Sequence, residues 1–237
     1  MNNHMTSVHI RETAINLHTY NRSLELCARM NYETEVLDFI DQLNKDDILY
    51  DLGSAEGRFS LYAALKGIRV LAFEPENKNY DVFMENIKLN PGVDKKLTVY
   101  NLAVGETNQA STIKVGQPWA GGHQKIVAAG PGRDDLDFSF HEEQAITIVC
   151  FDDFLENNEA PFPTALKIDI DGSEISFVKG AKKTLADSRV KKIIFELCIV
   201  DKSYIEIINL LNSVGYQEQS RFSIPNEPNL YNIIFTK

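Results

Sequence analysis

The chain has 237 residues, 43 % hydrophobic and 24 % charged, which is typical of a folded globular protein and excludes a disordered one. Its 34 acidic residues outnumber its 24 lysines and arginines, and the net charge of -10 argues against a general nucleic-acid or anionic-membrane binder. The sequence shows no membrane-spanning apolar run and no secretory signal, and its three cysteines lack C-x-x-C spacing. We therefore expect a cytoplasmic protein without a membrane or nucleic-acid partner; the oligomeric state stays open.

Residues 1–47 are interpreted as a helical N-terminal extension that packs on the domain that follows. Leu24, Cys27 and Met30 recur at helical spacing, and a second apolar stripe follows over residues 36–43. The polar residues 44–47 end this pattern.

From Ile48 onward, short apolar strands alternate with amphipathic helices, and this alternation typically builds a parallel sheet covered on both faces. We therefore predict one α/β domain over residues 48–237. The expected strands are 48–50, 69–73, 97–102, 165–170, 192–197, 216–223 and 230–235. The expected helices are 59–66, one around 80–87, one around 177–185, and 202–214.

Residues 105–150 form an insertion between the third and fourth core strands. Strands are expected at 111–115 and 145–149, and between them residues 116–144 hold five glycines, two prolines, Trp119, His123 and His141. A loop of this length inside a compact domain is usually functional or disordered. It is either a lid over the site, with Trp119 as its apolar face, or a mobile surface excursion; Trp119 is alternatively a core residue.

The most informative motif is the loop 51–57, which follows a strand and opens a helix. Gly53 permits a tight turn and the close approach of a ligand, and Gly57 lets the helix begin close to the sheet. The loop is neither the dinucleotide fingerprint, because Ala55 and Arg58 replace two of its glycines, nor a phosphate-binding P-loop. Asp51, at the strand end, would repel a pyrophosphate but suits a cationic ligand.

Glu74 stands at the end of the next strand, where an acidic side chain commonly binds the ribose hydroxyls of an adenosine cofactor. Helix capping or a surface charge is the alternative for each acid alone. S-adenosylmethionine has a ribose, an ammonium and a sulfonium but no pyrophosphate, so it meets the demands of both acids.

Over residues 48–197 the sequence resembles the FkbM-like family of S-adenosylmethionine-dependent methyltransferases. The resemblance rests on Asp51-x-Gly53-x-x-x-Gly57, Phe73-Glu74-Pro75, Asn101-Leu102-Ala103, Phe151-Asp152-Asp153-Phe154, Lys167-Ile168-Asp169-Ile170-Asp171-Gly172-Ser173-Glu174, Lys179-Gly180 and Phe195-Glu196. Two positions depart from the family pattern: Asp171-Gly172 replaces Glu-Gly, and Cys150-Phe151-Asp152 replaces Thr-Leu-Asp.

The resemblance implies a doubly wound, mostly parallel seven-stranded sheet with an antiparallel last strand, a Rossmann-like methyltransferase fold. It also implies methyl transfer from S-adenosylmethionine to a hydroxyl of a sugar, glycan or other small metabolite. The residues it assigns to the cofactor are Asp51 and Gly53 at the methionine end, Glu74 at the ribose, Asn101 and Ala103 at the adenine, and Ser54, Gly57 and Pro75 in the adjoining loops.

Period-two alternation places Lys167, Asp169 and Asp171 on one side of the fourth core strand and its extension. Asp169 is expected to border the methyl group and the acceptor hydroxyl, with Lys167 as its charge partner; a buried ion pair followed by an Asp-Gly turn is the alternative. A further alternative is an oxygen-rich Mg²⁺ site of Asp169, Asp171 and Glu196.

An alcohol is a weak nucleophile at neutral pH, so the reaction needs a base. His123 and His141 are candidates because imidazole titrates near neutrality, and Asp169 competes with them. Two other functions stay open: a nicotinamide-dependent oxidoreductase on a similar sheet, and a cofactor-binding protein without catalysis.

Overall fold

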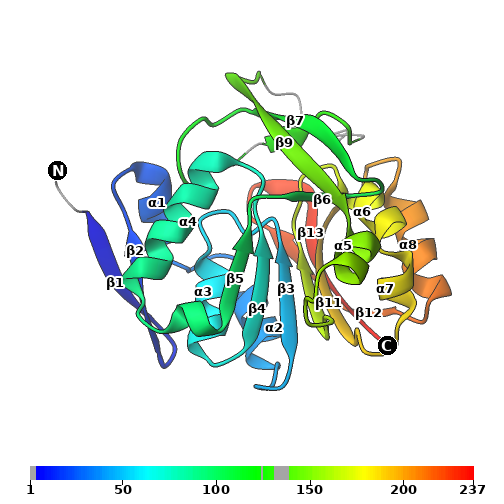
Figure 1. Cartoon of the computed structure of the whole chain (residues 1–237), viewed down its shortest axis with the longest axis horizontal. Coiled ribbons are helices and arrows are strands. Elements are labelled where there is room, and N and C mark those ends of the chain that lie inside the picture. Colours follow the sequence, from blue (N-terminus) through cyan, green and yellow to red (C-terminus); the bar gives the residue numbers. More distant parts are fainter. Residues whose placement is uncertain (1–3, 124, 131–138) are drawn as a thin grey trace.

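The computed structural model describes residues 4–123, 125–130 and 139–237 (Figure 1). Its central sheet has seven strands in the described part of the chain, in the order β12-β13-β11-β10-β3-β4-β5. These strands are β3 (Ile48–Leu52), β4 (Arg69–Phe73), β5 (Leu97–Tyr100), β10 (Ala165–Ile168), β11 (Lys192–Cys198), β12 (Gln217–Ile224) and β13 (Glu227–Thr236). In this sheet β13 runs opposite to the other six described strands, which confirms the doubly wound α/β prediction.

Helices cover both faces of this sheet, because successive strand residues point to opposite sides. On β3, Leu49 packs into one core cluster, whereas Tyr50 and Leu52 pack into the other. Figure 1 shows α5–α8 on one side and α2–α4 on the other. The helices are α1 (Arg22–Cys27), α2 (Thr34–Asp41), α3 (Arg58–Leu65), α4 (Asn77–Leu89), α5 (Phe151–Asn157), α6 (Glu174–Gly180), α7 (Lys182–Ala186) and α8 (Tyr204–Ser213), with the 3-10 turn η1 (Val93–Lys95).

The N-terminal extension is only partly helical, and the prediction was wrong for its first part. Residues before α1 form a hairpin of β1 (Met5–Ile10) and β2 (Thr13–His18). Alternation explains it, since Ile15 and Leu17 are buried while their neighbours are not. The exposed edge of β2 forms hydrogen bonds with two asparagines at the end of α4. The backbone N–H groups of Asn16 and His18 donate to the side chains of Asn90 and Asn86, respectively.

The insertion forms its own four-stranded sheet within the described residues, in the order β6-β9-β7-β8. Its strands are β6 (Ala103–Gly105), β7 (Gln109–Val115), β8 (Lys125–Val127) and β9 (Glu142–Cys150). The two strands expected here are thereby confirmed, while Gln124 and residues 131–138 of the expected loop lie outside the described residues. Trp119 is 45 % exposed, so it is not a core residue; its Nε1–H donates to Ser23 Oγ at 2.7 Å.

Across the described ranges, no helix combines the length and the apolar character needed to cross a bilayer.

Candidate active site

A cleft of about 690 Å³ lies at the carboxyl ends of β3, β4, β10 and β11, within the usual range for small-molecule sites. Parallel strands end at one edge of a sheet, so the loops that follow them converge there. Figure 1 shows the insertion strands β7 and β9 crossing near this edge. Four groups of residues line the cleft: Gly53, Ser54, Glu74, Pro75, Ala103, Asp169 and Asp171 after the core strands; Ile113, Gly122, His123 and Lys125 of the insertion; Tyr32 and Glu33 of the extension; and Pro225, Asn226, Glu227 and Leu230 of the C-terminal hairpin.

The loop after β3 needs glycine at two positions, for the tight turn that the sequence predicts and for close packing against other segments. Gly53 has φ +79°, and a Cβ there would lie 1.7 Å from the Asp169 carbonyl oxygen. The close approach is therefore to the backbone after β10. Gly57 has φ +87°, and its Cβ would meet the Phe83 ring at 2.1 Å, so it accommodates α4 rather than the sheet.

Asp51 is not among the described residues that line the cleft, and its expected contact with the methionine end stays a prediction. Its side chain is almost fully buried; it accepts a hydrogen bond from Ser60 Oγ at 2.6 Å, and Lys167 Nζ lies 3.1 Å from Oδ1. Because these partners occupy its carboxylate, Asp51 acts on the cleft through Lys167.

Glu74 is where the sequence predicts a ribose-binding acid, and its carboxylate is oriented by the backbone. Oε2 accepts the Ala55 N–H and Oε1 accepts the Glu76 N–H, each at 2.9 Å. Burial raises the pKa of Glu74 to about 7, against the lowering effect of Lys125. Each oxygen keeps a second acceptor site for a ligand hydroxyl.

Lys125 is a cleft residue that the sequence analysis missed. Its Nζ lies 3.2 Å from Glu76 Oε2, and its side chain is 10 % exposed. Lys125 belongs to β8, whereas Glu76 caps α4, so only the folded insertion brings the two together.

At the expected adenine position, the residues divide between two roles. Ala103 and Leu102 line the cleft, as does Pro75 beside Glu74. Asn101 is absent from the lining among described residues, because its side-chain amide donates to the Glu74 and Pro75 carbonyls at 3.0 and 3.2 Å. Asn101 therefore holds the Glu74–Pro75 loop in place.

Lys167 and Asp169 form the ion pair that the sequence predicts, with Nζ 3.4 Å from Oδ2. Lys167 Nζ also donates to the Gly53 carbonyl at 3.3 Å. Burial alone would lower the pKa of Lys167, but Asp51 and Asp169 outweigh it and raise the pKa above its usual value. Lys167 therefore stays cationic and joins the ends of β3 and β10.

The two histidines have different positions. His123 is exposed and lines the cleft. His141 is exposed as well, but it is not among the described lining residues, and its backbone N–H donates to the Val115 carbonyl in the insertion sheet. Of the two, only His123 is placed to meet a bound molecule.

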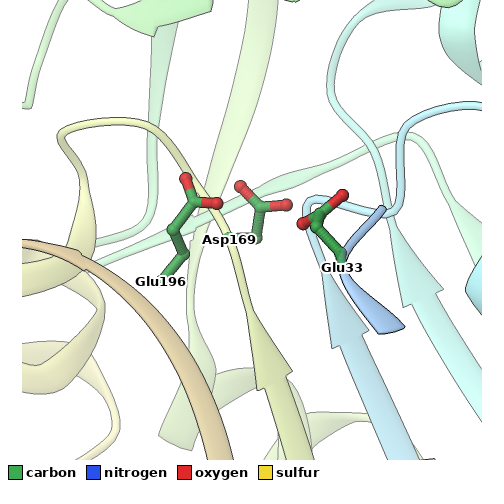
Figure 2. A group of neighbouring side chains, drawn as sticks. All are labelled: Glu33, Asp169 and Glu196. Carbon is green, nitrogen blue, oxygen red and sulfur yellow. The ribbon is translucent and has the colours of Figure 1, made fainter. Parts of the chain in front are cut away.

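Three carboxylates gather at one part of the cleft: oxygens of Glu33, Asp169 and Glu196 all lie within 4.8 Å of one another (Figure 2). Asp171, in place of Glu33, was the expected third member of this group. The strand β10 ends at Ile168, so strand alternation does not extend to Asp171, which lines the cleft with φ +30°. Glu33 was missed because it comes from the distant N-terminal extension.

The arrangement of Glu33 depends on Arg58. Glu33 has a left-handed backbone conformation at the start of α2, and Arg58 Nη2 donates to its Oε2 at 2.6 Å. A second bond from Arg58 reaches Glu56 Oε1 at 2.9 Å. The buried Arg58 thereby docks the extension against the helix that follows the Gly53 loop.

Comparison with known proteins agrees with this architecture. A family model described as the methyltransferase FkbM domain matches residues 51–218, most of the chain and all of the core-strand loops described above. The chain belongs to the FkbM methyltransferase family. This membership supports methyltransferase activity and favours it over the nicotinamide-dependent oxidoreductase.

A curated relative of this family member is the hexuronic acid methyltransferase AglP of Haloferax volcanii. The two are 28 % identical over 146 residues, which cover 62 % of this chain. The match spans 54 % of AglP, about half of its length.

Solved structures show the same fold at low sequence identity. Methyltransferase FkbM from Methylobacillus flagellatus superposes with a TM-score of 0.56 at 20 % identity, over 83 % of this chain and 45 % of that one. The putative tRNA (m1A22) methyltransferase Sp1610 of Streptococcus pneumoniae, solved with S-adenosyl-L-methionine, gives a TM-score of 0.51 at 12 % identity, over 86 % and 72 % of the two chains. The Rossmann-like methyltransferase fold predicted from the sequence is confirmed.

Proposed function

We propose that the protein is an S-adenosylmethionine-dependent O-methyltransferase that acts on a hydroxyl of a sugar, a glycan or another small hydroxylated metabolite. The observation that carries the proposal is the distribution of charge in the cleft. Glu74 presents a carboxylate suited to two ribose hydroxyls, and the acidic group Glu33, Asp169 and Glu196 suits a ligand with cationic groups.

The cleft residues fit this donor better than a dinucleotide. Each lysine or arginine among the described lining residues already faces a carboxylate: Arg58 faces Glu33 and Glu56, Lys125 faces Glu76, and Lys167 faces Asp51 and Asp169. A pyrophosphate would need cations or open backbone N–H groups that are not committed in this way. A sulfonium and an ammonium instead gain from the surplus of negative charge.

The chain's residues contribute binding, alignment and control of a proton. When bound, the cofactor would supply an electrophilic methyl group; the new O–C bond forms as the S–C bond breaks, its electron pair staying on sulfur. Glu74 and the loop 53–55 would hold the nucleoside, and the insertion and C-terminal hairpin would exclude water. The acceptor proton needs a base among the carboxylates or His123.

The acceptor class rests on the relative and on the site. AglP is a hexuronic acid methyltransferase, and a cleft lined by polar side chains and by the ring of Tyr32 suits a hydroxylated ring.

The cytoplasmic location expected from the sequence is part of the proposal, and the three cysteines, all of them described, are free thiols, as is usual in a reducing compartment. Mg²⁺ at the acidic group is the alternative to a metal-free reaction, and loss of turnover with EDTA would favour it.

Ligand-dependent stabilisation and methyl transfer test the proposal together. At 100 times its dissociation constant, S-adenosylmethionine should stabilise the fold by about 2.7 kcal/mol in a thermal-shift or denaturation assay. Methyl-labelled cofactor should label hexuronic acid oligosaccharides or simple glycosides. Stabilisation by NAD and none by S-adenosylmethionine would overturn the proposal, and binding without any label transfer would support a non-catalytic protein.

A further inference from the structure

The ammonium group of Lys125 is buried in the wall of the cleft with its N–H groups unused. Its Nζ lies 3.2 Å from Glu76 Oε2, as an ion pair, but among the described residues no atom accepts a hydrogen bond from it, and the side chain is only 10 % exposed. Most buried polar groups in proteins are hydrogen-bonded, and a buried ammonium without an acceptor is costly. Because Lys125 lines the cleft, its N–H groups point to an acceptor atom of a ligand.

Glu76 balances the charge of Lys125 but is engaged elsewhere. It caps α4: its Oε1 accepts the Lys78 N–H and its Oε2 accepts the Asn79 N–H, each at 2.9 Å. The capping bonds fix the carboxylate in place, and the ion pair in turn holds the ammonium at the cleft. Glu76 thereby keeps Lys125 charged and leaves its N–H groups to a ligand.

Glu74 lies near Lys125 without pairing with it. Within residues 4–123, 125–130 and 139–237 no ion pair joins the two, although Lys125 is close enough to lower the pKa of Glu74. Both side chains line the cleft. An ionised carboxylate only accepts hydrogen bonds and an ammonium only donates them, whereas a hydroxyl does both. A ligand hydroxyl that enters between them can therefore bond to each at once.

We propose that Lys125 is a binding residue for the nucleoside of the methyl donor: its ammonium donates a hydrogen bond to a ribose hydroxyl whose own proton is accepted by Glu74. The inference deepens the proposed function and rests on it, because it requires a ribose at Glu74. Glu74 alone satisfies the O–H of that hydroxyl but offers nothing to its oxygen lone pairs. Lys125 supplies the missing donor, and since it belongs to β8, it ties the insertion to the bound nucleoside.

A carboxylate of the methyl acceptor is a poorer partner for Lys125. The ammonium is flanked by Glu74 and Glu76, so an incoming anion would meet two negative charges for one positive charge. A neutral hydroxyl has no such repulsion. The surroundings of Lys125 therefore favour a ribose hydroxyl over an anionic group such as the carboxylate of a uronic acid.

Coupling between Lys125 and the ribose hydroxyls tests the proposal without acceptor or turnover. The dissociation constants of S-adenosylhomocysteine and of its 2′-deoxy and 3′-deoxy analogues are measured by calorimetry at pH 9, above the pKa of about 7 of Glu74, so that its ionisation contributes little. Lys125→Met should bind S-adenosylhomocysteine about tenfold or more weakly, the scale of a hydrogen bond to a charged group. For the analogue that lacks the contacted hydroxyl, the same substitution should cost less than about threefold, because that hydrogen bond is already missing.

Two further variants separate the hydrogen bond from a structural role. Lys125→Arg keeps a charged donor and should keep the wild-type difference between S-adenosylhomocysteine and the analogue. Lys114→Met removes a lysine of β7 in the same sheet, which is not among the described lining residues, and should bind all three ligands like the wild type.

Two results would overturn the proposal. The first is an equal loss of affinity for all three ligands in Lys125→Met, because a structural effect does not depend on a ribose hydroxyl. The second is a wild-type protein that binds both deoxy analogues as tightly as S-adenosylhomocysteine. Failure of the wild type to bind S-adenosylhomocysteine at all would instead refute the proposed function.

Discussion

At the scale of single residues, the cleft depends on charges that reach it from distant parts of the chain. Glu74 follows a core strand, yet the cation that acts on it, Lys125, comes from the insertion. Arg58 and Lys167 likewise hold acidic side chains that belong to other elements. The electrostatics of the site therefore depend on how the insertion and the extension pack against the sheet.

Lys125→Met should make cofactor binding more sensitive to acid. Lys125 lowers the pKa of Glu74, which is about 7, so its removal raises that pKa and protonates Glu74 at higher pH. A protonated Glu74 accepts fewer hydrogen bonds from ribose hydroxyls. The dissociation constant of S-adenosylmethionine, measured from pH 6 to 9, should begin its acid-side rise at higher pH in Lys125→Met. Lys125→Arg, which keeps the charge, should follow the wild type; superimposed curves for Lys125→Met would contradict this account.

At the scale of elements, two strand ends meet at the base of the cleft. The loop after β3 touches the backbone after β10 at Gly53, and Lys167 of β10 donates to the Gly53 carbonyl. These contacts join the loop after β3 to the Asp169 segment. The two segments can lie this close together because Gly53 has no side chain.

Gly53→Ala should cost more than the backbone conformation alone explains. A positive φ costs a non-glycine residue about 1–3 kcal/mol, and a Cβ at Gly53 would also lie 1.7 Å from the Asp169 carbonyl oxygen. Gly92→Ala is a matched control, because Gly92 has φ +87° with nothing within 4 Å of its Cβ. Denaturant unfolding should show a larger loss of stability for Gly53→Ala, together with weaker cofactor binding. Equal losses of stability in the two variants would mean that the loop can shift away from the backbone after β10 at no cost, and would contradict this account.

At the scale of the whole molecule, the sheet supplies a rigid floor and the added segments supply the walls. The extension, the insertion and the C-terminal hairpin all line the cleft. Two large apolar clusters on opposite faces of the sheet hold the floor together. Buried carboxyls inside this body carry a cost that depends on pH.

The pH dependence of global stability should contain a term from Glu174. Burial chiefly raises its pKa to about 8, whereas the unfolded side chain titrates near 4.5. Between these values the native state binds more protons than the unfolded state, so this group makes stability fall as pH rises, by at most about 1.4 kcal/mol per pH unit. Glu174→Gln should reduce the fall in unfolding free energy from pH 5 to 8, measured by denaturant titration. A slope identical to that of the wild type would contradict the assignment.

Several parts of the fold could be predicted because their causes are local. The strands β3, β4 and β10 are short, nearly continuously buried apolar runs, the helices between them show apolar stripes at helical spacing, and Gly53 and Glu74 follow strand ends directly. In the hairpin over residues 5–18 the signal is alternation, since Ile15 and Leu17 alternate with less buried neighbours, but the helical stripe over residues 24–43 predicts a helical extension instead.

The sequence by itself determined the core strand and helix order and the turn after β3, and it placed Glu74 at the end of β4, because neighbouring residues specify backbone geometry. Tertiary structure decided that Asp51 lies behind the cleft on Lys167, that Glu33 joins Asp169 and Glu196, and that Lys125 faces Glu76. These contacts join segments far apart along the chain. Their partners are selected by docking of whole elements and by the need to compensate buried charge, which no local spacing specifies.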